Sequence, residues 1–240
     1  MSGHSKWAQI KRQKGINDQK RGKTFTKLGN AITIAVKQGG GVGDPNSNFR
    51  LRLAMDAARA ANMPKENIER AIKRASEKTA GELSEVTYEG FAPGGVSVIV
   101  EAATDNPMRT TSEVKNVFSK SNASFGQPGS VSYQFKHIGR IIVKKGTNTF
   151  DDIFAIALDN QAEDIEEVGD EVFVYTTMSD LSKIKDALSA KGLEIAEADL
   201  IREPVVTVSV DDHEKLSKID SFISALEEMD DVQKVYTNLG

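Results

Sequence analysis

Residues 139–201 read GRIIVKKGTNTFDDIFAIALDNQAEDIEEVGDEVFVYTTMSDLSKIKDALSAKGLEIAEADLI, and their pattern indicates the fold class of this 240-residue chain. Short runs rich in β-branched residues lie at 140–144 and 172–176. Stretches with helical periodicity lie at 150–160 and 180–191. Taken in order, the segment predicts strand, helix, strand, strand, helix, strand, which is the order of a ferredoxin-like unit.

The flanking segments predict a second α/β unit that this first one interrupts. Before it, β-rich runs lie at 96–100 and 131–135, with helical periodicity at 110–121 between them. After it, a β-rich run at 205–210 is followed by helical periodicity at 214–229. The two flanks therefore belong together, although they are far apart in the chain.

The predicted fold class is α+β, with three domains. Residues 1–80 form a basic three-helix domain, and residues 81–137 and 204–240 form a discontinuous ferredoxin-like α/β domain. Residues 138–203 form a ferredoxin-like βαββαβ domain inserted into the discontinuous one. Within the insertion, the acidic stretch at 163–171 is interpreted as a solvated turn between strands.

The first 80 residues predict three helices. The first spans residues 20–38 and ends at the glycines 39–41, the second spans residues 48–61, and the third starts at Pro64, which suits the first turn of a helix. The expected core stripes are Phe25, Leu28, Ile32, Ala35 and Val36 in the first helix, Phe49, Leu53, Ala57 and Ala61 in the second, and Ile68, Ala71, Ile72 and Ala75 in the third.

The formal net charge of −4 conceals a strong division along the chain. Residues 1–80 contain 17 Lys and Arg against 6 Asp and Glu, whereas residues 81–240 contain 14 against 29. On the third predicted helix, Arg70, Lys73 and Arg74 face away from the apolar stripe. A tight basic cluster carried on an acidic body indicates contact with a polyanion. An uneven but merely solvated surface is the alternative.

Composition excludes several classes of protein. The chain has no cysteine, which excludes a disulfide framework, thiolate metal sites and a cysteine nucleophile, and which fits a reducing cytosol. No apolar run approaches the roughly 20 residues that span a bilayer, and no apolar segment follows the basic N-terminus as it would in a signal peptide. We therefore expect a cytoplasmic protein without a membrane partner.

No motif points to catalysis. Residues 21–24, RGKT, look like the end of a phosphate-binding loop, but six residues rather than four separate Gly15 from Gly22, and no strand precedes them. The three histidines have no metal-ligand spacing. The acidic residues at 211–214 are interpreted as the cap of the following helix rather than as a metal site. We expect no enzymatic activity, no cofactor, no metal and no small-molecule substrate.

The basic N-terminal segment is the predicted binding region. Residues 1–27 hold eight Lys and Arg, one acidic residue and the single tryptophan of the chain, Trp7. Lys and Arg neutralise phosphates and release counterions without reading sequence. Trp7 offers a face on which a base can stack, worth about 1–3 kcal/mol; the alternative is that it anchors the segment on the helical core. Apolar residues are sparse before Lys20, so we expect this segment to become ordered on binding.

Several short motifs closely resemble those of the YebC/PmpR family. The opening motif is GHSKW at 3–7, and DxKRGKxFxK follows at 18–27. The further motifs are GG at 39–40, NMPK at 62–65, NI at 67–68, RAI at 70–72, YEG at 88–90, PGG at 93–95, TDN at 104–106, RT at 109–110 and GSV at 129–131. The resemblance covers the chain nearly end to end, and the opening motif is highly specific.

This resemblance implies a helical N-terminal domain and two α/β domains, one inserted in the other. It also implies a transcriptional regulator that binds DNA, although relatives include a mitochondrial translational activator of cytochrome oxidase and bacterial members linked to stalled ribosomes. Between Asn106 and Arg109, family members commonly have a polar and basic pair, where this chain has Pro107 and Met108. A phosphate contact of that loop would be lost here, which leaves Arg109 to serve, with Lys115 and Lys120 nearby.

The predicted nucleic-acid contacts combine basic side chains with the polar residues of the opening motif. They are His4, Ser5, Lys6, Trp7, Lys11, Arg12, Lys14, Lys20, Arg21, Lys23, Lys27, Arg70, Lys73, Arg74 and Arg109.

Three functions compete at this point. The second and third helices superficially resemble a DNA-binding helix-turn-helix, but the turn holds a proline and the third helix lacks a run of Asn and Gln that would read adenine edges. A basic segment with one aromatic residue suits folded RNA, which favours a ribosome-associated translation factor. An enzyme acting on nucleic acid has no candidate site. We expect a nucleic-acid-binding regulator of gene expression, with a DNA-binding transcriptional regulator first and a ribosomal RNA-associated translation factor as the alternative.

Overall fold

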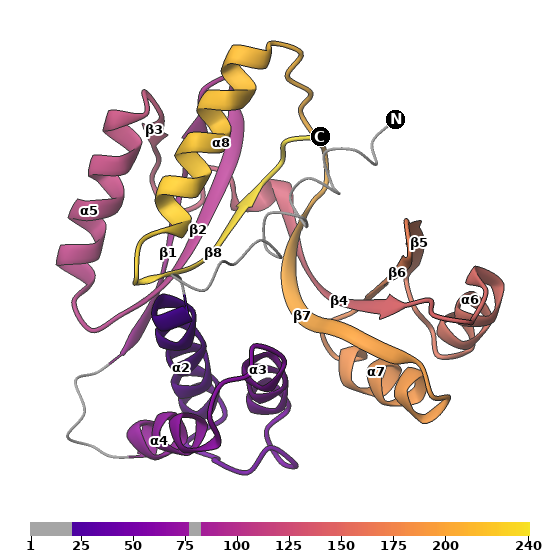
Figure 1. Cartoon of the computed structure of the whole chain (residues 1–240). Helices are drawn as coiled ribbons and strands as arrows, with labels where there is room; N and C mark the ends of the chain where they lie inside the picture. Colours follow the sequence, from indigo (N-terminus) through magenta and orange to yellow (C-terminus); the bar gives the residue numbers. More distant parts are fainter. Residues whose placement is uncertain (1–20, 77–82) are drawn as a thin grey trace. The chain divides into compact units, whose positions relative to one another are not determined.

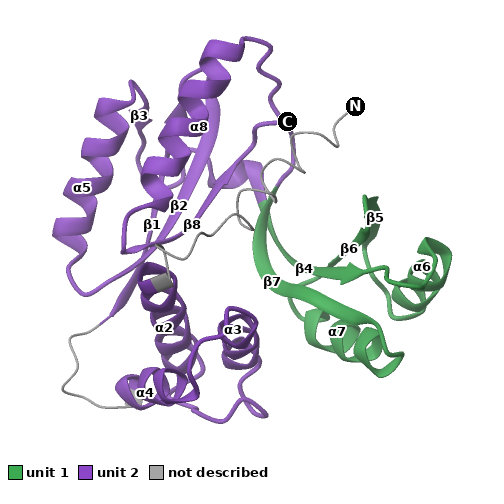
Figure 2. Ribbon diagram, in the orientation of Figure 1, with its two compact units in different colours: residues 1–7, 136–203 green, residues 8–135, 204–240 purple. Residues whose placement is uncertain are grey.

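The computed structural model describes residues 21–76 and 83–240 (Figure 1). These residues divide into two compact units (Figure 2). One unit is Lys136–Glu203, and the other consists of the remaining described residues. The N-terminal helices therefore share a unit with the discontinuous α/β part. The three predicted domains and their boundaries stay a prediction.

The predicted fold class is confirmed, because a helical N-terminal region precedes two four-stranded antiparallel sheets with their helices. In chain order the elements are α2 (Arg21–Gln38), α3 (Phe49–Ala60), α4 (Lys65–Ser76), β1 (Ser84–Ala92), β2 (Val96–Thr104), α5 (Pro107–Lys120), β3 (Ser124–Phe125), the 3₁₀ helix η2 (Ser132–Gln134), β4 (Phe135–Lys144), α6 (Phe150–Asp159), β5 (Asp164–Val168), β6 (Glu171–Thr176), α7 (Leu181–Ala190), β7 (Glu194–Pro204), α8 (His213–Glu227) and β8 (Val232–Thr237). All the helices predicted from periodicity are present, with ends that differ by a few residues.

The helices α2, α3 and α4 pack around one apolar core. From α2, Ile32 and Val36 are fully buried, and Phe25 and Leu28 pack against them. From α4, Ile68 is buried in the same cluster. The stripes predicted for the first and third helices are therefore confirmed.

The stripe predicted for the second helix is only partly right. Leu53 is buried as predicted, but Phe49, Ala57 and Ala61 are not, and α3 contributes Leu51, Met55 and Ala58 to the core shared with α2 and α4. The cause is the N-cap residue Asn48, whose side chain accepts a hydrogen bond from the Leu51 backbone N–H and donates one to the Ala35 carbonyl, 2.8 Å away. These bonds fix the rotation of α3 about its axis. Because apolar residues of α3 occur in two adjacent registers, spacing alone did not distinguish them.

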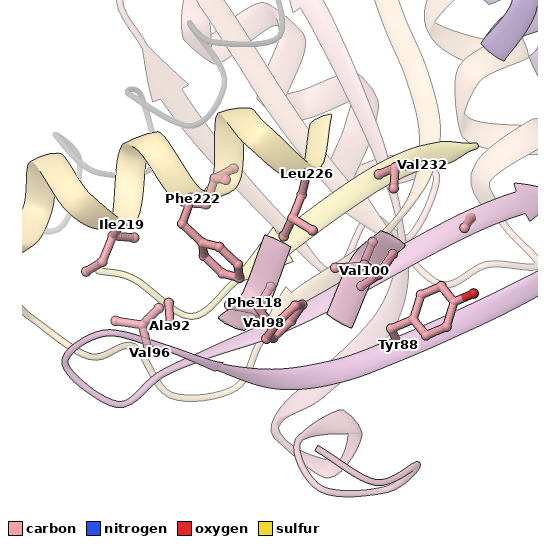
Figure 3. Close-up of a cluster of buried hydrophobic side chains, with 13 residues drawn as sticks. Tyr88, Ala92, Val96, Val98, Val100, Phe118, Ile219, Phe222, Leu226 and Val232 are labelled. Carbon is pink, nitrogen blue, oxygen red and sulfur yellow. The ribbon is translucent and has the colours of Figure 1, made fainter. Parts of the chain in front are cut away.

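The sheet of the discontinuous part has the strand order β3-β1-β2-β8. The hairpin of β1 and β2 forms its centre, with Tyr88 paired to Val100. The helices α5 and α8 contribute Phe118 and Phe222, whose ring centroids lie 4.9 Å apart, to a core against Val98 and Val100 of β2 (Figure 3). Segments that are far apart in sequence thus share one core, which explains why the two flanks fold together.

Two of the predicted strands are absent. Residues 131–135 hold the 3₁₀ helix η2, and β4 begins only at Phe135. The cause is Glu89, whose buried carboxylate takes the backbone N–H groups of Val131 and Ser132 that a strand would use for pairing. Residues 205–210 form no strand and contribute one isolated bridge, from Val208 to Leu239. β-branched composition alone therefore misled the prediction where no partner strand was available.

The inserted unit, Lys136–Glu203, has the predicted element order β4-α6-β5-β6-α7-β7 and the sheet order β5-β6-β4-β7. The solvated turn predicted at 163–171 is wrong, because Asp164–Val168 form the edge strand β5 and only the residues around Gly169 turn, with a φ of 61°. Acidic residues are tolerated there because an edge strand keeps one side in water.

Candidate nucleic-acid interface

Eight predicted contact residues lie outside the described residues. They are His4, Ser5, Lys6, Trp7, Lys11, Arg12, Lys14 and Lys20. Their assignment, and the choice between base stacking and core packing for Trp7, stays a prediction. Arg21 is the first residue of α2.

The basic face of α4 is exposed as the sequence predicts. Lys73 and Arg74 lie three and four residues after Arg70, so the three side chains share one face of the helix, and all three are exposed. Ile68 and Ala71 of the same helix are buried in the helical core. No ion pair joins Arg70 or Arg74 to another residue within 21–76 or 83–240. This face therefore offers guanidinium groups that can reach a phosphate without first breaking such a pair.

Lys23 and Lys27 of α2 are engaged within the protein. The Nζ of Lys23 donates a hydrogen bond to the Glu228 carbonyl oxygen at 3.0 Å and lies 3.6 Å from the Asp230 carboxylate. The Nζ of Lys27 donates to the Glu227 carbonyl. These carbonyls belong to the C-terminal end of α8, where the last backbone oxygens lack helical partners and carry the negative end of the helix dipole. Both lysines therefore cap α8 in the free protein.

Arg109 is also engaged. Its Nη2 atom donates to Asp231 at 2.8 Å and to Asp105 at 3.1 Å. The hydrogen bond and the charge of Asp231 raise the pKa of Arg109. Burial of Asp231 opposes its ionisation, but hydrogen bonds from Thr110 and Arg109 outweigh this and lower the pKa of Asp231. A phosphate that binds Arg109 must compete with two carboxylates.

The departure at Pro107 and Met108 coincides with the start of α5. Pro107 occupies the first turn of α5, where its missing N–H costs nothing. The Asn106 side chain caps the helix by accepting a hydrogen bond from the Arg109 backbone N–H at 3.1 Å. Met108 is 83% exposed. This helix start is thus closed by a protein side chain and flanked by Asp105, which disfavours an anion there.

One turn brings several of these groups together. The turn between α8 and β8, residues 228–231, supplies the carbonyl and carboxylate that hold Lys23 and also the carboxylate that holds Arg109. The sequence pattern predicted no role for this turn. Its composition could have indicated a role in binding basic side chains. The end of the predicted helix and the turn after it hold four acidic residues in succession, Glu227, Glu228, Asp230 and Asp231.

Two of the motifs that carry the family resemblance build a buried carboxylate site. Glu89 of β1 is 6% exposed. Its carboxylate accepts hydrogen bonds from the backbone N–H groups of Gly129 at 2.8 Å, Val131 at 2.7 Å and Ser132 at 2.9 Å. Burial opposes ionisation of Glu89, but these three donors outweigh it and lower its pKa. The motifs at 88–90 and 129–131 therefore position the loop that leads into η2.

The acidic residues before α8 act as the predicted helix cap. Asp212 caps α8, because its carboxylate accepts from the Glu214 backbone N–H at 2.9 Å and the Lys215 backbone N–H at 3.2 Å, so the predicted cap is confirmed. Among the described residues, no three His, Asp or Glu side chains are grouped as a metal would require. None of the helices in this part of the chain has the length and apolarity to cross a bilayer.

Comparison with known proteins places the whole chain in one family. The family model "TACO1/YebC protein N-terminal domain" matches residues 5–78, and the model "TACO1/YebC second and third domain" matches residues 83–239. A "probable transcriptional regulatory protein" of Syntrophomonas wolfei is 46% identical over 242 residues, which cover 100% of this chain and 96% of that protein. A protein of the same name from Roseiflexus castenholzii is 48% identical over 244 residues, covering 100% and 95%.

The fold agrees with a solved structure. The crystal structure of a conserved hypothetical protein from Aquifex aeolicus superposes with a TM-score of 0.86 at 41% identity, covering 93% of this chain and 91% of that one. Because family models match both parts of the chain and relatives align along nearly their full length, the chain belongs to the TACO1/YebC family.

Proposed function

We propose that this protein is a nucleic-acid-binding regulator of gene expression, and first of all a DNA-binding transcriptional regulator. The exposed basic face of α4, Arg70, Lys73 and Arg74, is the observation that carries the proposal. It lies in the part of the chain that holds 17 Lys and Arg against 6 Asp and Glu. The naming of relatives as "probable transcriptional regulatory protein" supports the regulatory role.

The contact surface we propose has two parts. The exposed face of α4 makes the first phosphate contacts together with the basic N-terminal segment. Lys23, Lys27 and Arg109 are held by the end of α8 and by its acidic turn, so they join only if a phosphate displaces those partners. Contacts of this kind give affinity and salt dependence but carry no base specificity.

A ribosomal RNA-associated role is the second candidate. Helix α4 presents Arg and Lys with a single amide side chain, Asn67, and no run of Asn and Gln, so it supports binding to phosphates more than the reading of adenine edges in a major groove. Phosphates of folded RNA satisfy the same side chains. The acidic remainder of the chain is repelled by any polyanion, which favours one-sided contact.

Catalysis forms no part of the proposed function. The described residues offer no group of three metal-ligating side chains, and we propose that the protein acts by binding, in the cytoplasm, without cofactor or small-molecule substrate. Calorimetry with ATP or a divalent metal tests this part, since a saturable shift in melting temperature would contradict it.

The decisive experiment compares two ligands under the same conditions. The full-length protein is titrated by fluorescence anisotropy against duplex DNA and a structured ribosomal RNA fragment at four salt concentrations, and its sedimentation with intact ribosomes is measured in parallel. The transcriptional proposal predicts tighter binding to DNA and no cosedimentation, and the ribosomal one predicts the reverse. Failure to bind either ligand at low salt would overturn both.

A further inference from the structure

Helix α6 of the inserted unit is apolar on two faces. On its inner face, the α6 residues Ile153 and Ala157 are fully buried. Phe154 and Leu158 point outward and remain 39% and 56% exposed. Amphipathic helices on a protein surface normally keep their outer face polar, and a helix that is apolar all round is normally buried. Phe154 and Leu158 on the outer face of α6 are therefore exposed, although such apolar side chains are normally buried against another part of a protein.

The two exposed residues continue a stripe that begins at the half-buried Phe150. Phe150, Phe154 and Leu158 are spaced four residues apart, so they lie one above the other along the helix. The rings of Phe150 and Phe154 pack against each other with centroids 5.7 Å apart. Single exposed apolar side chains need no explanation, but a stacked row of them marks a contact surface.

Acidic side chains surround this stripe. Asp151 and Asp159 of α6, and Glu163 and Asp164 just after it, are exposed. None of the four forms an ion pair with residues of the described part of the chain. Residues 136–203 as a whole contain 15 Asp and Glu against 8 Lys and Arg. The surface therefore combines an apolar centre with an unneutralised negative rim.

We propose that the outer face of α6 binds a basic amphipathic helix of a partner protein. Such a helix presents an apolar stripe to Phe150, Phe154 and Leu158 and its Lys and Arg to the acidic rim. Charge favours this occupant: nucleic acid and anionic lipid are repelled, and a two-fold contact with a second copy of this chain would bring Asp151 and Asp159 against their own counterparts. This inference is independent of the proposed nucleic-acid binding, because it concerns the acidic unit alone.

The test uses the full chain and a synthetic 18-residue peptide of Leu and Lys in which Leu recurs at helical spacing. Fluorescence anisotropy should give saturable binding, weakened about tenfold by Phe154→Ser with Leu158→Ser, since both anchors are lost. Met178→Ser is the matched control, because Met178 is 43% exposed in the same unit but does not belong to α6. It should bind like the wild type. Asp151→Asn with Asp159→Asn should weaken binding about threefold and flatten its salt dependence.

Several outcomes would overturn this proposal. One is equal binding of a scrambled Leu–Lys peptide of the same composition, which would mean charge attraction alone. Another is unchanged affinity in the Phe154 and Leu158 double variant while circular dichroism shows it folded. A third is a wild-type dimer in sedimentation that this variant converts to a monomer, since the occupant is then a second copy. If the Phe154 and Leu158 double variant does not fold, the variant with Asp151→Asn and Asp159→Asn decides. Peptide binding with the affinity and salt dependence of the wild type would then contradict the proposal.

Discussion

The Nζ of Lys23 in α2 donates a hydrogen bond, 3.0 Å long, to the carbonyl oxygen of Glu228 at the end of α8. The same ammonium group lies 3.6 Å from the Asp230 carboxylate. A lysine that sequence assigns to phosphate binding thus also satisfies the C-terminus of a helix in the α/β part. The acidic turn after α8 therefore competes with nucleic acid for the basic helix.

This competition predicts a gain of affinity on removing a carboxylate. Asp230→Asn leaves the carbonyl bond in place but removes the negative charge beside Lys23, so duplex DNA or RNA should bind about two- to threefold more tightly at low salt. The gain should shrink as salt screens the pair. Anisotropy titrations at low and high salt measure both effects.

The control for Asp230→Asn is Asp170→Asn, which makes the same change of net charge in the inserted unit. Asp170 lies in the turn between β5 and β6. If the two variants gain equally, overall charge explains the effect and the local competition is refuted.

Glu89→Gln should destabilise the protein strongly. The amide keeps one acceptor oxygen, but three backbone N–H groups now converge on a neutral side chain, and its NH₂ group faces donors. A loss of about 1–3 kcal/mol in the free energy of unfolding is expected. Urea unfolding followed by circular dichroism measures it. A loss below about 0.5 kcal/mol would show that this carboxylate does not hold the loop.

The pH dependence of stability follows from the same carboxylate. The pKa of Glu89 is lower in the folded protein than its ordinary value of 4.5. The folded state therefore binds a proton at Glu89 more weakly than the unfolded state does. The ionised carboxylate contributes its full stabilisation of the fold above pH 4.5, and this contribution disappears as pH falls through the pKa of Glu89 in the folded protein. Unfolding curves from pH 7 downward should show wild-type stability falling below this value more steeply than that of Glu89→Gln. Parallel curves would contradict the assignment.

Sequence patterns predicted those parts of the fold that depend on neighbours in the chain. Helical periodicity located all the helices from α2 to α8, because an apolar stripe repeats within a few residues. The rotation of α3 about its axis was not predicted, because it depends on a hydrogen bond from the Asn48 side chain to the Ala35 carbonyl. The strand predicted at 131–135 failed for the same kind of reason, since Glu89 lies more than 40 residues earlier in the chain.

Charge counts identified the basic part of the candidate site, but they did not show which of its side chains are already bonded to other residues of the free protein. The face of α4 could be predicted because Arg70, Lys73 and Arg74 share one helix. The engagement of Lys23 and Arg109 by the turn after α8 could not, because Glu228 and Asp231 lie 205 and 122 positions away from them in the sequence. A count of charges does not distinguish a lysine open to solvent from one that caps another helix.

Gly39→Ala tests whether the Asn48 side chain, which links the start of α3 to α2, fixes the rotation of α3 about its axis. A Cβ on Gly39 would collide with the Asn48 side chain, which caps α3 and bonds to the Ala35 carbonyl. Loss of that cap and of its buried bond should cost about 1–3 kcal/mol. Gly22→Ala is the control, because nothing lies within 4 Å of the added Cβ and alanine favours a helix. Urea unfolding should show a loss in the first variant and none in the second; equal stability would show that Asn48 moves freely.

The strongest test of the proposed function lies on α4. Replacing Arg70, Lys73 and Arg74 by alanine removes exposed charges from a single helix face while leaving Ile68 and its core contacts in place, so the helix should still fold. Because each phosphate contact lowers the slope of log K against log salt by about 0.7 to 0.9, the triple variant should flatten that slope by about two units on DNA and on structured RNA, and weaken all sequences alike. Lys65→Ala is the control, since Lys65 lies on the same helix but pairs with Glu69 at 3.5 Å. It should leave the slope within about half a unit of the wild type. If the triple variant keeps the wild-type slope and affinity on both ligands, the face of α4 is not the binding surface, and the proposed function loses the observation on which it rests.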